Sequence, residues 1–158
     1  MLSSILEDAI TRDQNNRQYG FRNLDVKVDQ QNLRIVLSAL TNCMPPDSLY
    51  NPSEIHAIWL ILQHNLMRYA KEYFALLEKH AAHGLLEKGE LAMMEDRILI
   101  DDRKPQIYGS QICRNRSTRE WELCQPVDLK NINVRRAEVG LEPLEVYLEN
   151  WGIVLDSI

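Results

Sequence analysis

The chain contains 158 residues, 45% of them hydrophobic and 26% charged, which is the size and composition of one globular domain with a buried core. Its formal net charge of −5 argues against strong non-specific binding to nucleic acid or to an anionic membrane, although local basic patches remain open. No segment approaches the roughly 20 apolar residues of a transmembrane helix. We therefore expect a single domain over residues 1–158, with no nucleic-acid partner and no membrane association.

The cysteines predict a reducing compartment. Cys43, Cys113 and Cys124 include no C-x-x-C pair, and an odd number cannot form a closed disulfide framework. Cys113 and Cys124 could face one another across a hairpin, but reduced thiols are the favoured interpretation. The N-terminus has acids within its first eight residues and no apolar run of signal-peptide length. We expect a cytoplasmic protein.

Helical periodicity dominates the N-terminal half. Apolar residues three and four positions apart predict a short helix over 2–12 and a second over 30–42, with Asp29 as its N-cap. The run Asn51-Pro52-Ser53-Glu54 is a helix start signal. The helix that follows extends toward Gly84.

Such a helix would contain about 30 residues, near the upper end of the usual range. We therefore expect a kink or break near Gln63 to Asn65, and a glycine cap at Gly84.

The C-terminal half combines helices with one hairpin. Residues 87–100 repeat the helical spacing, and the runs 110–114 and 120–124 have strand character on either side of a polar turn. Two more helices are predicted within 128–140 and 143–151. The expected fold is mainly α (α+β): a helical bundle-like single domain with one small antiparallel β-hairpin near residues 110–124.

His64 is the first candidate for chemistry. On a helix its neighbours include Leu60, Ile61 and Met67, so the imidazole would lie among mostly apolar side chains. A buried histidine needs hydrogen-bond partners. It is either a core residue bonded to the backbone or to a carboxylate, or a catalytic or ligand-binding group.

Asp96 and Arg97 follow on a later helix. Asp96 shares a face with apolar residues such as Met93 and Leu99. Burying a carboxylate without a partner costs several kcal/mol, so a partner is implied. Structural ion pairing and a pre-organised anchor in a pocket are both open interpretations.

The loop after this helix contributes Gln106, Tyr108 and Gln111. Pro105 favours an extended approach, and Gly109 permits a positive φ or a close backbone contact. In an extended segment Gln106 and Tyr108 would face the same side. They could orient a polar ligand or pin the loop to the helix that carries Asp96.

Two arginines and an acid–base pair complete the candidates. Arg135 and Arg136 are adjacent, so they cannot both face one direction on a helix. One is expected near the site and one in solvent, with a salt bridge to a nearby aspartate as the simpler role. Asp13 and Arg17 have the i, i+4 spacing of an ordinary exposed helix pair and are included among the binding residues.

Several common sites are absent from the sequence. It contains no G-x-S-x-G, G-x-x-x-x-G-K-[ST] or G-x-G-x-x-G motif. His80 and His83 have a spacing that could hold a metal, but no third ligand is evident, and histidines at a helix end are the simpler interpretation. We predict no metal site, and no cofactor is indicated.

Many of these residues belong to a spaced pattern. Its parts are D-Q-x-x-R, D-x-x-N, Q-H, D-R, Q-x-Y-G-[ST]-Q and R-R-x-x-x-G-L. In this chain they correspond to Asp13 to Arg17, Asp29 to Asn32, Gln63-His64, Asp96-Arg97, Gln106 to Gln111 and Arg135 to Leu141. In this pattern the chain resembles a bacterial domain family of unknown function over most of its length. The resemblance implies a shared fold and a shared set of site residues, and it implies no reaction.

The chain departs from the pattern at two places. Arg103 stands where the family usually has glycine, which bears on the turn before the loop. Asn65 and Leu66 follow His64, where the family tends to have a small or polar residue and then an acid.

The leading hypothesis is a single pocket for a small polar or anionic ligand. In an enzyme, His64 would be the general acid or base, oriented by Asp96, in hydrolysis or group transfer. The competing hypothesis is a non-catalytic module for a protein partner, in which the polar network is structural. The residues expected to converge are His64, Asp96, Arg97, Gln106, Tyr108, Gln111 and one of Arg135 and Arg136.

Overall fold

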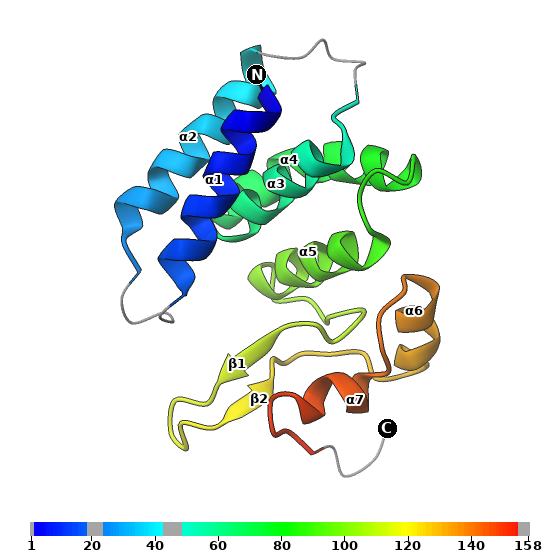
Figure 1. Cartoon of the computed structure of the whole chain (residues 1–158). Helices are drawn as coiled ribbons and strands as arrows, with labels where there is room; N and C mark the ends of the chain where they lie inside the picture. Colours follow the sequence, from blue (N-terminus) through cyan, green and yellow to red (C-terminus); the bar gives the residue numbers. More distant parts are fainter. Residues whose placement is uncertain (1, 19–23, 43–48, 155–158) are drawn as a thin grey trace. The chain divides into compact units, whose positions relative to one another are not determined.

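The computed structural model describes residues 2–18, 24–42 and 49–154 (Figure 1). Within these ranges the chain forms seven helices and one two-stranded antiparallel sheet, so the predicted mainly α fold with a small β part is confirmed. None of the helices in the described ranges is long and apolar enough to cross a membrane.

The chain divides into two compact units, Met1–Leu86 and Glu87–Ile158. Each unit is described by itself below. The expectation of a single domain over residues 1–158 stays a prediction.

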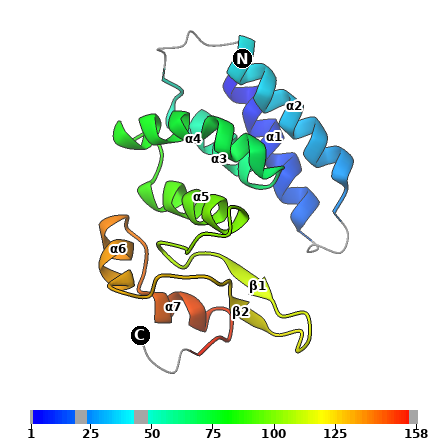
Figure 2. The ribbon, with the colours of Figure 1, turned by 180° about the vertical axis from the view of Figure 1, so that it is seen from behind.

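The first unit is helical. In Figure 1 its two N-terminal helices lie side by side, and Figure 2 shows the same arrangement from behind. Both of them contact the third helix, which in turn contacts the fourth. The helices are α1 (Leu2–Arg17), α2 (Val26–Asn42), α3 (Pro52–Gln63) and α4 (Met67–Ala82).

The predicted start of α3 is confirmed. The Asn51 side chain accepts a hydrogen bond from the Glu54 backbone N–H at 3.0 Å, and Glu54 accepts one from the Asn51 N–H at 3.0 Å. This reciprocal capping box satisfies two backbone donors at the helix end. The helix it starts has a fully buried apolar face, at Ile55, Ile58, Ile61 and Leu62.

The predicted break in the long helix is also confirmed, because α3 ends at Gln63 and α4 begins at Met67. Gly84 adopts the expected left-handed conformation, with φ +69°. The predicted cap at Asp29 is wrong: α2 begins at Val26 and Asp25 caps it, accepting from the Lys27 N–H at 2.9 Å.

The second unit surrounds a small apolar core. Its hairpin pairs Ile112 with Leu123 and Arg114 with Trp121, so the predicted hairpin is confirmed with shorter strands. The elements are α5 (Lys88–Asp101), β1 (Ile112–Arg114), β2 (Trp121–Leu123), α6 (Ile132–Glu138) and α7 (Leu144–Glu149). The core residues are Leu123, Ile132, Leu144 and Leu148.

A disulfide joins Cys113 and Cys124, which corrects the expectation of reduced thiols for this pair. Cys113 lies in β1 and Cys124 directly follows β2, and their Cα atoms are 5.1 Å apart, within the range that a disulfide spans. Cys43 lies outside the described residues. Because disulfides persist mainly in oxidising compartments, the cytoplasmic location stays a prediction.

Candidate functional site

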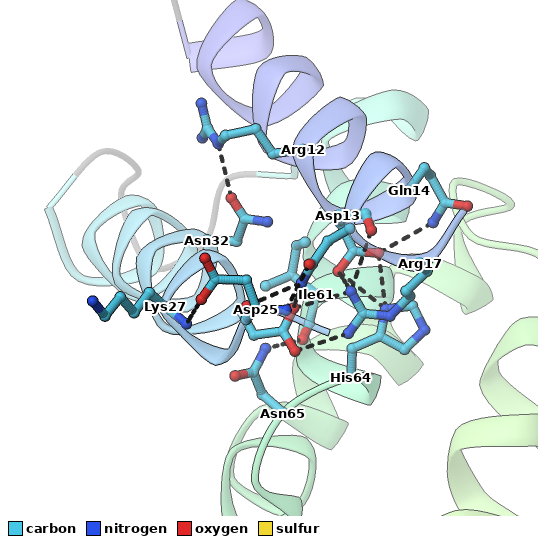
Figure 3. Close-up of polar contacts among 12 residues, drawn as sticks. Arg12, Asp13, Gln14, Arg17, Asp25, Lys27, Asn32, Ile61, His64 and Asn65 are labelled. Carbon is cyan, nitrogen blue, oxygen red and sulfur yellow. Dashed lines mark hydrogen bonds and ion pairs between the residues drawn. The ribbon is translucent and has the colours of Figure 1, made fainter. Parts of the chain in front are cut away.

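The sequence-predicted site residues form two polar clusters, one in each unit. The first cluster joins Asp13, Arg17 and His64 and is drawn in Figure 3. Convergence of the two clusters on one pocket stays a prediction. The second cluster contains Asp96, Arg97, Gln106, Tyr108, Gln111, Arg135 and Arg136.

The centre of the first cluster is a contact between Asp13 on α1 and His64 at the end of α3. His64 Nδ1 lies 2.9 Å from Asp13 Oδ2 and 3.2 Å from Oδ1. The Asp13 side chain is 1% exposed and that of His64 is 20% exposed. The carboxylate that orients His64 is therefore Asp13, whereas the sequence had suggested Asp96.

Arg17 fixes this carboxylate from the other side. Its Nη1 donates to Asp13 Oδ1 at 2.6 Å, and its two terminal nitrogens donate to the two oxygens of Asp29 at 3.0 and 3.2 Å. One guanidinium thus bridges two carboxylates from α1 and α2. The interpretation of Asp13 and Arg17 as an exposed pair is wrong, because the ion pair is largely buried.

These contacts decide what His64 can do. Asp13 is paired with Arg17 and therefore acts as a carboxylate, which only accepts hydrogen bonds. The proton must then be on His64 Nδ1. Within the part of the chain that the structure describes, Nε2 has no hydrogen-bond partner. This is the arrangement of a carboxylate-oriented imidazole that can exchange a proton at Nε2.

Asn32 adds an unsatisfied polar group next to the cluster. It lies on α2, and its Oδ1 accepts from Arg12 Nε at 3.1 Å (Figure 3). Its Nδ2 is buried and has no hydrogen-bond partner among the described residues. Leaving a buried donor unpaired costs about 1 to 3 kcal/mol, so this group is a candidate contact for a water molecule or a ligand oxygen. Its only signal in the sequence was the family pattern.

The second cluster is organised around Asp96, which is completely buried on α5. One carboxylate oxygen accepts from the N–H groups of Ile107 and Tyr108 at 2.7 and 3.1 Å. The other accepts from the Ser110 N–H at 2.8 Å. The partner that the apolar surroundings implied is therefore the backbone of the loop, since charge-assisted hydrogen bonds to several amides compensate a buried carboxylate.

The two arginines hold the same loop through its carbonyl groups. Arg135 Nε donates to the Ile107 carbonyl at 2.8 Å, and Arg136 Nη1 donates to the Tyr108 carbonyl at 2.6 Å. The expected division into one site-facing and one solvent-facing arginine is thus wrong: Arg136 is 1% exposed. The acid nearest Arg135 is Asp128, at 3.7 Å.

Gln106 and Gln111 complete the loop's internal bonding. The Gln106 amide is fully buried, donating to the Cys124 carbonyl at 2.6 Å and accepting from the Gln111 N–H at 2.7 Å. Arg97 Nε donates to the Gln111 side chain at 3.3 Å. Burial lowers the pKa of Arg97.

Gly109 has both features that the sequence suggested for it, a positive φ and a close approach to neighbouring residues. It has φ +64°, and a Cβ atom there would lie 3.1 Å from methyl groups of Ile132 and Leu144. The neighbouring Tyr108 is half-buried, and burial, followed by the charges of Glu95 and Asp96, raises the pKa of its phenol.

The contacts of the second cluster favour a structural role. The buried carboxylate, carboxamide and guanidinium groups are directed at backbone atoms between residues 106 and 142. Their positions determine the shape of the loop. The first cluster, in contrast, leaves His64 Nε2 without a partner in the described ranges, and the neighbouring Asn32 Nδ2 is unpaired there too.

The two helix-end histidines hydrogen-bond with backbone groups. His80 is fully buried; its Nε2 accepts from the Tyr50 N–H at 2.9 Å, and its Nδ1 lies 2.7 Å from the Leu76 carbonyl. His83 Nδ1 lies 2.7 Å from the Lys79 carbonyl. Among the described residues, no group of three or more His, Cys, Asp and Glu side chains is arranged to hold a metal ion.

The fold and the geometry of the site define the class of this protein. It is mainly helical, has two compact units, and carries a histidine oriented by a carboxylate in the first unit. The chain belongs to a family of unknown function (DUF6624), whose model matches residues 25–153. This confirms the resemblance seen in the sequence. No curated protein and no solved structure matches the chain. The matched range includes His64 and Asn32, whereas Asp13 and Arg17 precede it.

Proposed function

We propose that the first cluster is a general acid–base site at which His64 Nε2 exchanges a proton with a small polar or anionic ligand. The reaction class we propose is hydrolysis or group transfer. The observation that carries the proposal is the 2.9 Å contact between His64 Nδ1 and the buried carboxylate of Asp13. Such a carboxylate fixes the ring orientation and stabilises the imidazolium that forms when Nε2 accepts a proton.

Each group of the first cluster then has a role. His64 Nε2 removes a proton from a water molecule in hydrolysis, or from the hydroxyl of an acceptor molecule in group transfer. The oxygen then forms a bond to the electrophilic centre of the ligand, the bond to the leaving group breaks, and Nε2 returns the proton to that group. Asp13 orients the ring, and Arg17 holds the Asp13 carboxylate in place. The unpaired Asn32 Nδ2 supports the proposal as a donor for a ligand oxygen.

The tautomer of His64 tests the proposal without a known substrate. In ¹⁵N-resolved NMR spectra, neutral His64 is expected to have its proton on Nδ1 and a free lone pair on Nε2. The variant Asp13→Asn should change this distribution, because an amide can donate as well as accept. A wild-type ring protonated on Nε2 alone would contradict the proposal.

Activity gives the second test. 4-Nitrophenyl acetate and 4-nitrophenyl phosphate are suitable first probes for hydrolysis. His64→Gln should reduce any turnover by at least about 100-fold, the usual minimum for a general acid or base. The matched control is His83→Gln, which changes an exposed histidine. A His64→Gln variant that loses most of its stability would favour a structural histidine.

The second candidate function is a non-catalytic module for a protein partner. It is supported by the second cluster, where buried polar groups such as Asp96 and Arg136 bind loop backbone. In that case, Gln106→Ala and His64→Gln would both reduce stability and neither would remove an activity. Comparing thermal unfolding with ligand binding for these two variants separates the candidates.

A further inference from the structure

The second unit has an exposed aromatic surface that the proposed function does not use. Trp121 on β2 and Trp151 after α7 have ring centroids 5.3 Å apart in an edge-to-face arrangement. They are 42% and 40% exposed, whereas the third tryptophan, Trp59, is 5% exposed. Tryptophan is usually well buried, so two adjacent exposed indoles are an uncommon feature of a protein surface.

Both indoles are held on rigid backbone. The Cys113–Cys124 disulfide ties the hairpin next to Trp121, and an isolated two-stranded hairpin would be marginally stable without such support. The backbone N–H of Trp151 donates to the Leu148 carbonyl at 2.9 Å. The turn after it is fixed by the Ile153 N–H, which donates to the Leu148 carbonyl at 3.1 Å. A pre-organised surface loses little entropy when it binds a partner.

Arginines outnumber acids in the hairpin next to these indoles. Arg114 ends β1, and the turn of residues 115–120 contains Arg116, Arg119 and one acid, Glu120, in a chain with a net charge of −5. The Arg114 guanidinium lies 5.8 Å from the centre of the Trp121 ring. Among nearby acids, Glu122 already accepts from the Asn115 amide at 2.9 Å.

The combination of exposed tryptophans and arginines is typical of an interaction surface. Tryptophan and arginine are enriched at protein interfaces and among the residues that contribute most to binding. The forked guanidinium suits carboxylates in particular. The surface thus combines an apolar anchor site with groups that attract negative charge.

We propose that this Trp–Arg surface, consisting of Trp121, Trp151, Arg114, Arg116 and Arg119, docks an acidic segment of a partner protein. An apolar side chain of the segment packs against the indoles, and its carboxylates pair with the arginines of the turn. This inference is independent of the acid–base proposal for His64.

A displayed library of random peptides, selected on the full chain with its disulfide intact, tests the proposal. Enriched peptides should carry Asp or Glu next to an apolar or aromatic residue. Trp121→Ser should weaken their binding at least about tenfold, as expected for a residue at the centre of an interface. Arg116→Glu should weaken binding several-fold and reduce its dependence on salt.

The control is Lys130→Glu, an equal change of charge. Figures 1 and 2 show the hairpin and α6, which follows Lys130, at opposite ends of the second unit. This control should bind like the wild type. If Trp121→Ser does not fold, Trp151→Ser and Arg116→Glu provide the same comparison.

Three outcomes would overturn the proposal. The first is a library selection that enriches no peptides, or only peptides without acids. The second is binding that is unchanged in the tryptophan and Arg116→Glu variants. The third is a concentration-dependent dimer in light scattering that Trp121→Ser abolishes, because the occupant would then be a second copy of the chain.

Discussion

Asp13 and His64 are 51 positions apart in the chain, and the carboxylate of one lies 2.9 Å from the ring of the other. The contact joins the C-terminal part of α1 to the C-cap residue of α3, and both helices belong to the first unit. Because Arg17 ties the same carboxylate to Asp29 on α2, the pair is part of a polar link among three helices. The candidate chemistry and the packing of the first unit therefore depend on the same carboxylate.

Asp13→Asn should lower the free energy of unfolding by about 1 to 3 kcal/mol, because buried partners of the carboxylate lose a charged acceptor. Asp8→Asn is the matched control: it lies on the same helix, is exposed, and should change stability by less than about 0.5 kcal/mol. Urea unfolding followed by circular dichroism measures both. Equal stability of the two variants would mean that the link among the helices contributes nothing.

Asp96→Asn should destabilise the second unit by at least about 1 kcal/mol. Three backbone N–H groups donate to this carboxylate. The asparagine side chain has only one acceptor oxygen, so its NH2 group would face at least one of these N–H donors. Each such unpaired donor costs about 1 to 3 kcal/mol. Hydrogen exchange should accelerate at Ile107, Tyr108 and Ser110. Glu149→Gln, an exposed substitution on α7, should leave these amides protected; similar exchange in both variants would argue against the role given to Asp96.

Local signals in the sequence predicted much of the fold. The cap at Asn51, the break after Gln63 and the left-handed glycine at Gly84 each depend on residues within one or two turns. The partner of His64 depended on the packing of α1 against α3, and periodicity contains no information about which acid meets which histidine. Asp29 was predicted to cap α2, but its carboxylate binds Arg17 instead, a contact between two helices.

The sequence predicted which residues form the second cluster, but it did not predict which atoms they contact. The sequence indicated that Asp96 is buried and needs a partner, and it placed the loop residues nearby. It favoured side-chain partners, whereas the structure uses backbone groups of the loop. Backbone donors and acceptors exist at every position, so their use at one site depends on the path of the chain in three dimensions.

The departure from the family pattern after His64 leads to a stabilising substitution. Leu66 is the N-cap of α4, has the extended backbone conformation of a cap, and provides no capping hydrogen bond. The resemblance to the family implies an acid at this position. Leu66→Asp should therefore raise stability by about 0.5 to 2 kcal/mol, whereas Leu66→Ala, which only shortens the exposed side chain, should not. Equal midpoints of thermal unfolding in the two variants would disprove the capping explanation.

Reduction of the Cys113–Cys124 disulfide should destabilise the second unit by about 3 kcal/mol, the loop-closure entropy of a link between residues 11 positions apart. Dithiothreitol should lower the midpoint of urea unfolding of the wild type. In the double variant Cys113→Ser and Cys124→Ser the midpoint should already be low, and the reductant should not change it further. If dithiothreitol lowered the midpoint of the double variant by a similar amount, the change would not come from the Cys113–Cys124 disulfide.

Alkaline pH should selectively weaken the contribution of Tyr147. Burial raises the pKa of its phenol above the ordinary value of 10.0, and the hydroxyl donates to the Ser110 carbonyl at 2.9 Å. The folded state therefore retains this proton more tightly than the unfolded state, so the stabilisation is complete below pH 10 and is lost as pH rises through the folded pKa. Tyr147→Phe should be less stable than the wild type by about 1 kcal/mol at neutral pH, the usual value of one hydrogen bond. Urea unfolding at about pH 8 and about pH 11 should show this difference shrinking, and a difference that stays constant would contradict the assignment.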